Sequence, residues 1–281
     1  MAQPLVTHIS DTARWVAVYR AWETKRRDAL FNDPFADRLA GDRGRAIAAT
    51  MPRQARSGWP LIMRTKLIDD LVLQTVHQGS DCILNLAAGL DTRPYRLPLP
   101  PTLRWTEADL PGILAEKEQL LADATPVCQL TRIAVDLADT DARRAFLAQA
   151  VGTARRVTVI TEGLLAYLED ETVRDIARDL AAQPAIHSWI VDVFSPAVRD
   201  LMQIGMGREL VGTPLRFAPP EGVAFFENLG WRVQHIGSIV RAAARARRLP
   251  WFLRPFMIFP DPDPRRLGAK QRWSAVLLLE R

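Results

Sequence analysis

Short apolar runs alternate with segments of helical periodicity through most of the chain beyond residue 78. A helix over 170–182, for example, places apolar residues at positions i, i+3, i+4 and i+7 from Val173 to Leu180. The apolar runs have the length of strands, and they lie at 82–86, 103–108, 129–135, 157–161, 188–194, 231–236 and 274–279. Strands that alternate with helices are typical of βαβ units, so the pattern predicts an α/β fold with a largely parallel sheet.

The first 78 residues show helical rather than strand-like spacing. Trp15, Tyr19 and Trp22 recur on one side of a predicted helix. A stronger helix begins at Pro60, and Gly79 ends it. This part of the chain is therefore expected to be mostly helical.

Composition and charge narrow the class of protein. The chain has 281 residues, of which 48% are hydrophobic and 25% charged, as in an ordinary globular protein. Its net charge of +5 is a small excess of 37 basic over 32 acidic residues. The densest basic stretch, Arg241 to Arg254, is expected to be a solvated helix face. The chain carries no nucleic-acid-binding signature, so no nucleic-acid partner is predicted.

Neither a metal site nor a membrane span is predicted. Cys82 and Cys128 form no CxxC motif, and the four histidines form no cluster with metal-ligand spacing. No signal peptide and no apolar run approaching 18 residues is present, which favours a cytoplasmic protein with no membrane partner. The apolar stretch Trp251 to Phe259 is interrupted by Arg254 and Pro255, so we expect a core or lid segment rather than a membrane anchor.

Ligands of open parallel sheets bind beyond the carboxyl ends of the strands, and small or acidic residues follow the first four strands here. Small residues at 87–89 would let the backbone approach a ligand closely, although they are equally typical of a tight strand-to-helix turn. No GxGxxG pattern follows, so a diphosphate has no obvious cradle. Asp109 lies 20 residues after Gly89 (109 − 89 = 20) and could accept from ribose hydroxyls, or could cap the helix that begins at Pro111.

Acidic residues follow the second, third and fourth strands at Asp109, Asp136 and Glu162. Carboxylates at the mouths of adjacent strands repel one another unless a ligand or cation lies between them. A nucleoside that carries a sulfonium would suit such a group better than a dinucleotide, whose phosphates are negative. Helix capping could explain any one of the three acids, and less easily all three.

The residues 85–97, NLAAGLDTRPYRL, resemble the "LGAGLDTRxYRL" signature of the leucine carboxyl methyltransferase-like family. That family includes protein phosphatase carboxyl methyltransferases and many bacterial S-adenosylmethionine-dependent enzymes, some of them polyketide O-methyltransferases, and this chain resembles the bacterial branch. Further matches, which extend the resemblance over roughly residues 11–195, are 107–111 with Lys117, 135–137, 161–168, 25–36 and Arg64-Thr65.

The resemblance implies a Rossmann-like class I methyltransferase fold: an N-terminal helical extension and a seven-stranded, mostly parallel sheet whose last strand is antiparallel. It also implies S-adenosyl-L-methionine as the cofactor. We expect one structural unit, in which residues 1–78 form a helical segment or lid on the core. Residues 79–281 would form the cofactor-binding α/β domain, with an acceptor-site insertion at about 195–230.

The resemblance also implies roles for individual residues. The guanidinium of Arg64 would bind the cofactor carboxylate, Glu162 would lie near the methionine moiety, and Asp109 would bind the ribose. The backbone of the first turn would border the methionine moiety, and the third strand would contact the adenine; these residues are Ala87, Ala88, Gly89, Asp136 and Leu137. Lys25 aligns more loosely, in a segment that would close over the site. Ala87 departs from the family pattern, in which a glycine stands here.

The predicted reaction is methyl transfer to a carboxylate or hydroxyl oxygen of a small-molecule acceptor, for which a polyketide-like compound is one candidate. A carboxylate is already ionised at neutral pH, whereas a phenol would benefit from a base. No convincing base is present: His187 and His235 are expected to be structural, and Tyr167, close after the fourth strand, is the one candidate for a residue facing the acceptor. Apolar residues that could line an acceptor pocket, or simply pack in the core, are Met202, Met206, Phe217, Phe225 and Phe226.

Three alternatives stay open. A non-catalytic protein of the same fold would bind S-adenosylmethionine without turnover. A nucleotide-dependent oxidoreductase would share the acid at Asp109 but should show a glycine-rich phosphate turn. A nucleic-acid methyltransferase is less favoured, because residues 161–164 read TEGL rather than an NPPY-like tetrapeptide.

Overall fold

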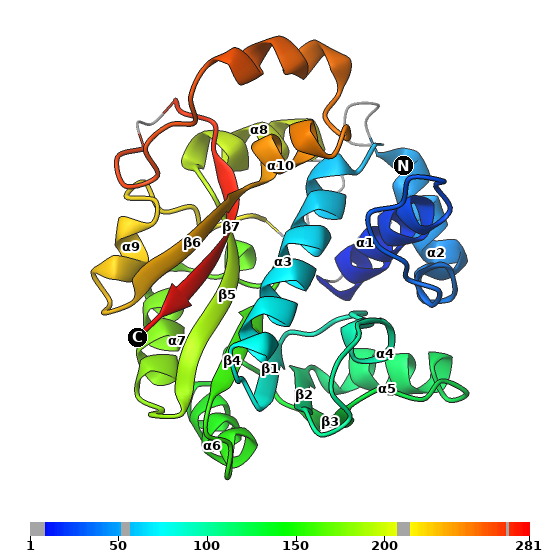
Figure 1. Cartoon of the computed structure of the whole chain (residues 1–281), viewed down its shortest axis with the longest axis vertical. Helices are drawn as coiled ribbons and strands as arrows, with labels where there is room; N and C mark the ends of the chain where they lie inside the picture. The colour runs from blue at the N-terminus through cyan, green and yellow to red at the C-terminus, as the bar shows by residue number, and fades with distance from the viewer. Residues whose placement is uncertain (1–8, 52–56, 207–213, 268–269) are drawn as a thin grey trace.

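The computed structural model describes residues 9–51, 57–206, 214–267 and 270–281. Its centre is one seven-stranded sheet with the strand order β3-β2-β1-β4-β5-β7-β6 (Figure 1). The strands are β1 Cys82–Leu86, β2 Arg104–Asp109, β3 Gln129–Ala134, β4 Val157–Thr161, β5 Ile186–Phe194, β6 Arg232–Ser238 and β7 Ser274–Glu280. Only β7 runs antiparallel to its neighbours, β5 and β6. The predicted Rossmann-like fold with an antiparallel last strand is confirmed.

The chain order reverses beside β1, which pairs with β2 on one side and β4 on the other. Asn85 of β1 is in register with Ile160 of β4, so the turn after β1 and the segment after β4 emerge side by side. A reversal of this kind opens a crevice at the carboxyl ends of the strands. The topology therefore brings the segments 87–91 and 162–164 to one place.

Helices cover both faces of the sheet, and each face has its own core. The long helix α3, Trp59–His77, lies across one face, and α6, Thr140–Val151, and α7, Asp170–Ala181, cover the other (Figure 1). Along β5, Trp189 packs with the α6–α7 side, whereas Ile190 packs with the α3 side. This alternation follows from the period of two in a strand and explains why the run in β5 is almost continuously apolar.

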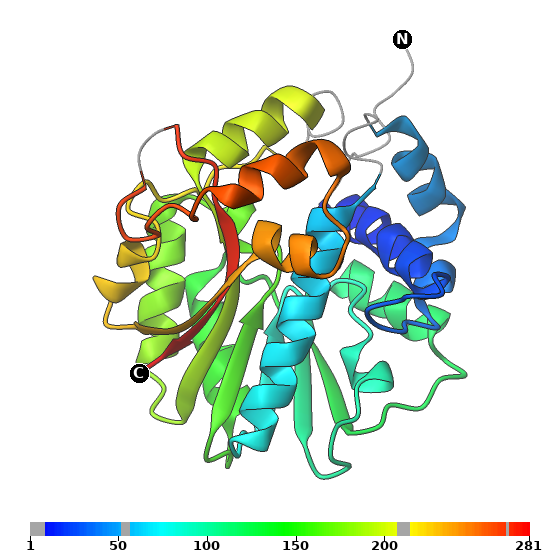
Figure 2. The ribbon, with the colours of Figure 1, turned by 45° about the horizontal axis from the view of Figure 1, so that its top comes forward.

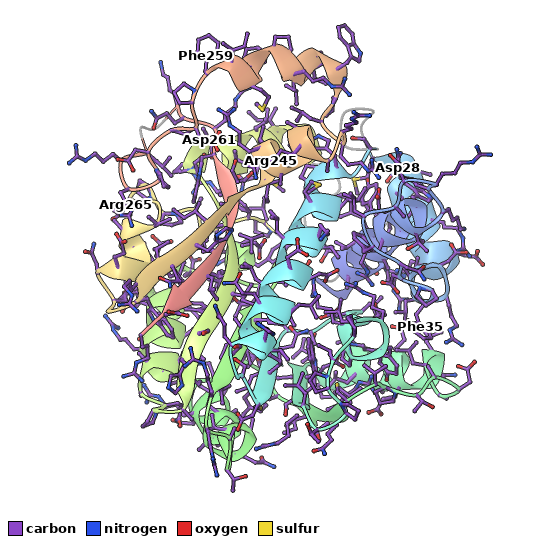
Figure 3. All side chains as sticks on the ribbon, viewed as in Figure 1. Asp28, Phe35, Arg245, Phe259, Asp261 and Arg265 are labelled. Carbon is purple, nitrogen blue, oxygen red and sulfur yellow. The ribbon has the colours of Figure 1, made fainter. Side chains whose placement is uncertain are left out.

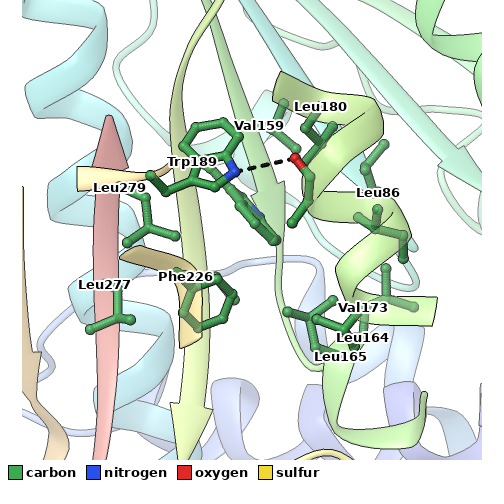
Figure 4. Close-up of a cluster of buried hydrophobic side chains, with 14 of the residues drawn as sticks. Leu86, Val159, Leu164, Leu165, Val173, Leu180, Trp189, Phe226, Leu277 and Leu279 are labelled. Carbon is green, nitrogen blue, oxygen red and sulfur yellow. Dashed lines mark hydrogen bonds between the residues drawn. The ribbon is translucent and has the colours of Figure 1, made fainter. Parts of the chain in front are cut away.

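The core on the α6–α7 side is dominated by Trp189 (Figure 4). Its ring meets Phe226 and Trp231 edge to face, with centroids 5.4 Å away in each case. Its indole N–H donates to the Thr161 hydroxyl at 2.8 Å, so the buried polar atom has a partner. The end of β4, where the candidate site begins, is thereby fixed to the central core.

The N-terminal helices pack beside the sheet rather than over it (Figure 2). Helix α1, Ile9–Thr24, lies against α2, Ala36–Thr50, which is kinked at Gly41. Tyr19 of α1 is fully buried within the cluster of side chains that joins these helices. The sequence placed Trp22 on the same side as Tyr19, but Trp22 is 45% exposed.

The remaining helices are short connections between strands. They are α4 Arg93–Arg96, α5 Pro111–Leu120, η1 Leu165–Tyr167, α8 Pro196–Met206, α9 Ala224–Glu227, α10 Ile239–Arg245 and η2 Trp251–Ile258. Predicted strand bounds agree with the structure to within two residues. Within the described ranges, no helix combines the length and the apolar character that crossing a bilayer requires.

Of the two expectations for Trp251 to Phe259, a core segment or a lid, the core segment is wrong. Helix η2 has no buried residue, and Trp251 and Ile258 are 79% and 85% exposed. A run of apolar residues does not show whether another element of the fold covers that segment. Here most of the side chains of the segment face solvent. The basic stretch before it was expected to be a solvated helix face, and Arg245 and Arg247 are indeed exposed.

Candidate functional site

A cavity opens at the carboxyl ends of β1 and β4, where the chain order reverses. Its polar wall contains Asp91, Asp109, Glu162, Asp192, Arg20, Arg64 and Arg93. Its apolar wall contains Trp15, Val16, Leu61, Phe194, Met202 and Leu215. Helices α1 and α3 therefore line the cavity together with the strand ends, and Met202 of α8 and Leu215 add to the apolar wall.

The turn after β1 has a backbone conformation that favours glycine. Gly89 has φ of +48°, and a Cβ built on it would lie 3.3 Å from the Cβ of Ala13 in α1. Ala87 also has a positive φ, +55°, which costs an L-residue about 1–2 kcal/mol. The turn thus exposes backbone rather than side chains to the cavity, as a closely approaching ligand requires.

Asp109 braces this turn. Its Oδ2 accepts from the N–H of Gly89 at 2.6 Å, and its Oδ1 accepts from the N–H of Leu110 at 2.7 Å. Burial raises the pKa of the Asp109 carboxyl above its ordinary value, although these bonds and the charge of Lys117 act against burial. The residue at the N-cap of α5 is Leu110, with no side-chain cap, so the capping interpretation of Asp109 is wrong.

Glu162 lies among positive charges. Its two oxygens accept from the guanidinium of Arg64 at 3.0 Å and from that of Arg93 at 2.7 Å. Burial by itself would raise the pKa of Glu162, but Arg93 and Arg64 outweigh burial and leave the pKa below its ordinary value. The repulsion expected from carboxylates at neighbouring strand ends is therefore relieved by the protein's own arginines.

Two further carboxylates complete this charged cluster. Asp91 pairs with Arg93 at 2.9 Å, and Asp192, near the end of β5, pairs with Arg64 at 3.1 Å. Asp192 also accepts from the N–H of Gly163 at 2.7 Å. A Cβ on Gly163 would lie 3.2 Å from the guanidinium of Arg64, so the absence of a side chain lets that group lie against the β4 turn.

Tyr167 lines the cavity, as expected for a residue that follows β4 closely. Burial raises the pKa of its hydroxyl, even though a hydrogen bond with Thr12 and the charge of Arg64 act in the opposite direction. The hydroxyl therefore stays protonated at neutral pH. Tyr167 can orient a ligand by hydrogen bonding, but it is unsuited to removing a proton.

Asp136 and Leu137 do not line this cavity. Asp136 is exposed and accepts from the backbone N–H of Ala138, whereas Leu137 is buried in the core on the α6–α7 side. They nevertheless follow β3, which is held against β2 by a bond from the N–H of Val135 to the carbonyl of Asp109. Of the three acids predicted to share a site, Asp109, Asp136 and Glu162, only Asp109 and Glu162 line the cavity.

Other candidates lie elsewhere. Lys25 is exposed and pairs with Asp37, His187 bonds to the carbonyl of Ala185, and His235 is exposed on β6. Of the apolar candidates for an acceptor pocket, Met202 lines the cavity, whereas three pack in the core: Phe217, Phe225 and Phe226. The side chain of Met206 lies outside the described residues, as do residues 207–213.

The charged cluster also contains residues that the sequence pattern did not predict as site residues, namely Asp91, Arg93 and Asp192. Asp91 and Arg93 stand inside the motif quoted for the family, but a linear pattern does not show which partners a charge will meet. Asp192 could have been noticed as the one charged residue in the apolar run 188–194. A charged residue within a buried strand is typical of a paired or functional group.

Replacing Ala87 with glycine is expected to stabilise the protein by about 0.5–1 kcal/mol, because the strain of a positive φ is removed while the unfolded chain gains some freedom. The midpoint of thermal unfolding should rise by about 1–4 °C. Ala88→Gly is the matched control, since Ala88 is not among the residues with positive φ, and it should destabilise. Destabilisation by both variants would contradict the strain assigned to Ala87.

Comparison with known proteins gives a consistent result. The family model for leucine carboxyl methyltransferase matches residues 13–181. A candidate S-adenosyl-L-methionine-dependent methyltransferase of Frankia alni is 30% identical over 253 residues, covering 85% of this chain and 87% of that protein. A similarly named protein of Mycolicibacterium smegmatis is 30% identical over 289 residues, covering 92% of this chain and 93% of its own.

Solved structures share the fold at low sequence identity. A DUF574 family protein from Streptomyces avermitilis has a TM-score of 0.60 at 15% identity, and 96% of this chain and 97% of that chain are covered. A candidate methyltransferase from Thermobifida fusca has a TM-score of 0.55 at 15% identity, with 94% of each chain covered.

Proposed function

The chain belongs to the leucine carboxyl methyltransferase family, and from this premise we propose that it transfers a methyl group to a carboxylate or hydroxyl oxygen of a small molecule. It is an S-adenosylmethionine-dependent methyltransferase, as its relatives are named. The observation that supports the site of the reaction is the cavity at the reversal of strand order, where Asp109 braces the turn after β1.

The residues of the cavity fit S-adenosylmethionine. The small residues of the turn, Ala87 to Gly89, leave backbone free to border the methionine moiety, and Asp109 would accept from the ribose. Arg64 would bind the carboxylate of the cofactor, and Glu162 would lie near its amino group. The wall holds four carboxylates against three guanidinium groups (4 − 3 = 1), an excess of negative charge that suits a cationic sulfonium.

The adenine would extend from the ribose toward the end of β3. Asp136 would accept from its amino group and Leu137 would supply apolar contact. Asp136 is solvent-exposed and its carboxylate reaches its own backbone at Ala138, so it is accessible to a ligand that passes Asp109. Leu137 is 8% exposed, which limits the contact it can give.

The bound cofactor supplies an electrophilic methyl group, and the protein supplies alignment and electrostatics. Trp15, Met202 and Leu215 offer an apolar wall against which an acceptor can be oriented. No histidine lines the cavity among the described residues, and Tyr167 stays protonated. These features favour a carboxylate acceptor, which is ionised at neutral pH and needs no base.

The cofactor is tested by thermal unfolding with S-adenosylmethionine, S-adenosylhomocysteine, NAD and NADP. At a ligand concentration about 100 times its Kd, the two sulfur compounds should add about 2.7 kcal/mol to the free energy of unfolding. NAD and NADP should have no effect, because the turn after β1 lacks a glycine-rich phosphate cradle. Stabilisation by NAD alone would reject the proposal in favour of an oxidoreductase.

The reaction is tested with methyl-labelled S-adenosylmethionine and a panel of small carboxylic acids and phenols. A carboxyl methyl ester releases labelled methanol in alkali, whereas a methyl ether does not. Alkali-labile product supports the preferred acceptor class, and alkali-stable product supports the hydroxyl. Tight cofactor binding with no turnover on any member of the panel would favour the non-catalytic alternative.

A further inference from the structure

Helix η2 and the residue after it present a ridge of large apolar side chains to solvent. The apolar ridge consists of Trp251, Phe252, Phe256, Ile258 and Phe259, which are 51–85% exposed. Figure 1 shows η2 arching over α8 and α10, at the end of the sheet where β5 ends and β7 begins. Several large apolar side chains exposed on one short segment mark an interaction surface more often than a scattered single residue does.

The ridge is held in place rather than frayed. Leu253 and Met257 face inward and pack with the cluster around Ile239 and Ala243. Arg241 of α10 donates to the carbonyl of Met257 at 2.7 Å and also to the carbonyl of Phe259. It pairs with Asp261 at 2.9 Å as well. The inner face and the carboxyl end of η2 are therefore fixed, and the ridge cannot turn inward without breaking these contacts.

Positive charge precedes and interrupts the ridge in the chain. The segment 239–260 contains five arginines and no aspartate or glutamate. Arg241 and Arg248 are paired with acids from other segments. Within the described residues no acid pairs with the other three arginines, Arg245, Arg247 and Arg254, and all three are exposed. Figure 3 shows Arg245 and Phe259 near the same end of the molecule.

We propose that the apolar ridge and its arginines dock the protein on the surface of an anionic lipid bilayer. Tryptophan and phenylalanine side chains enter the boundary between headgroups and acyl chains, while arginines beside them bind anionic headgroups. A second copy of this chain fits less well, because a symmetric dimer through the ridge would bring its arginines against those of the partner. Docking would place the carboxyl ends of the strands, and hence the cavity, near the lipid surface.

The test is co-sedimentation of the full chain with vesicles. Binding is expected to vesicles that mix phosphatidylcholine with phosphatidylglycerol, to weaken as salt is raised, and to be much weaker on phosphatidylcholine alone. The double variant Arg245→Gln/Arg247→Gln should bind about 30-fold more weakly, since each arginine near an anionic surface contributes about 1 kcal/mol. Trp251→Ser/Phe256→Ser should also lose binding, at unchanged thermal stability because both side chains are exposed.

Matched controls lie at the opposite end of the sheet. Arg155→Gln/Arg232→Gln removes the same charge from exposed positions at the starts of β4 and β6, and Val127→Ser removes an exposed apolar side chain before β3. Both controls should bind vesicles as the unchanged protein does. Equal binding to neutral vesicles, or equal loss in controls and ridge variants, would overturn the proposal. The proposal would also be overturned if the protein bound no vesicle and sedimented as a dimer that the ridge variants dissociate.

Discussion

Replacing Arg93 with methionine is expected to lower the free energy of unfolding by about 3–5 kcal/mol at neutral pH. Arg93 is 1% exposed and binds Asp69, Asp91 and Glu162 at 2.7–2.9 Å. Methionine keeps much of the volume but removes the charge, so buried carboxylates lose a common partner. The loss is measured by urea unfolding, with Arg178→Met as the control.

Arg178 is exposed on α7, where it pairs with two acids of its own helix, so its loss should lower the free energy of unfolding far less than the loss of Arg93 does. In the unchanged protein the pKa values of Asp91 and Glu162 lie below their ordinary values of 3.8 and 4.5. Their contribution to stability is therefore present above these values and lost as pH falls through the lower folded values. The difference between Arg93→Met and the unchanged protein should narrow as pH falls below 3.8 through the folded pKa values. Equal losses for both variants at pH 7 would contradict the role of Arg93.

Replacing Asp109 with asparagine is expected to weaken binding of S-adenosylhomocysteine by about 10- to 100-fold. A hydrogen bond to a charged group contributes about 1.5–3 kcal/mol, and the variant loses both the charge that would accept from the ribose and one acceptor for the turn. Titration calorimetry measures the affinity, and thermal unfolding measures the structural cost separately. Unchanged affinity would remove Asp109 from the cofactor site.

Asp81→Asn is the matched control for this variant. Asp81 lies just before β1, at the opposite end of the strand, and its carboxylate likewise accepts from backbone N–H groups, those of Arg155 and Arg156. It should cost stability without changing the affinity for S-adenosylhomocysteine. A loss of affinity in both variants would mean that Asp109 acts only through the stability of the sheet.

The pH dependence of binding gives a second measure of Asp109. Its pKa in the folded protein lies above the ordinary value of 3.8, and donors on the ribose favour the ionised carboxylate. Affinity should therefore fall as pH is lowered through that raised pKa. In Asp109→Asn this fall in affinity at low pH should disappear. If the variant shows the same pH profile as the original protein, the fall in affinity belongs to another titrating group.

Local pattern was sufficient for the framework of the fold. The run Val157–Thr161 is rich in apolar and β-branched residues. It is followed by Glu162-Gly163 and then by a helical period, so its prediction as a buried strand depends only on neighbours in the sequence. The spacing from Gly89 to Asp109 likewise placed both at the ends of adjacent strands. Strand-length apolar runs and the spacing of residues at strand ends can both be seen in a linear pattern.

The sequence therefore determined the α/β sheet, the positions of its strands, the family and the acid at the end of β2. Only the tertiary structure decided that Arg64 and Arg93 lie between Glu162, Asp91 and Asp192, and that most of the apolar side chains of the segment 251–259 face solvent. The stability of a buried charge depends on partners that are distant in the chain, and the burial of an apolar side chain depends on which segments cover it. Both depend on where segments far apart in sequence come to lie, which no local pattern specifies.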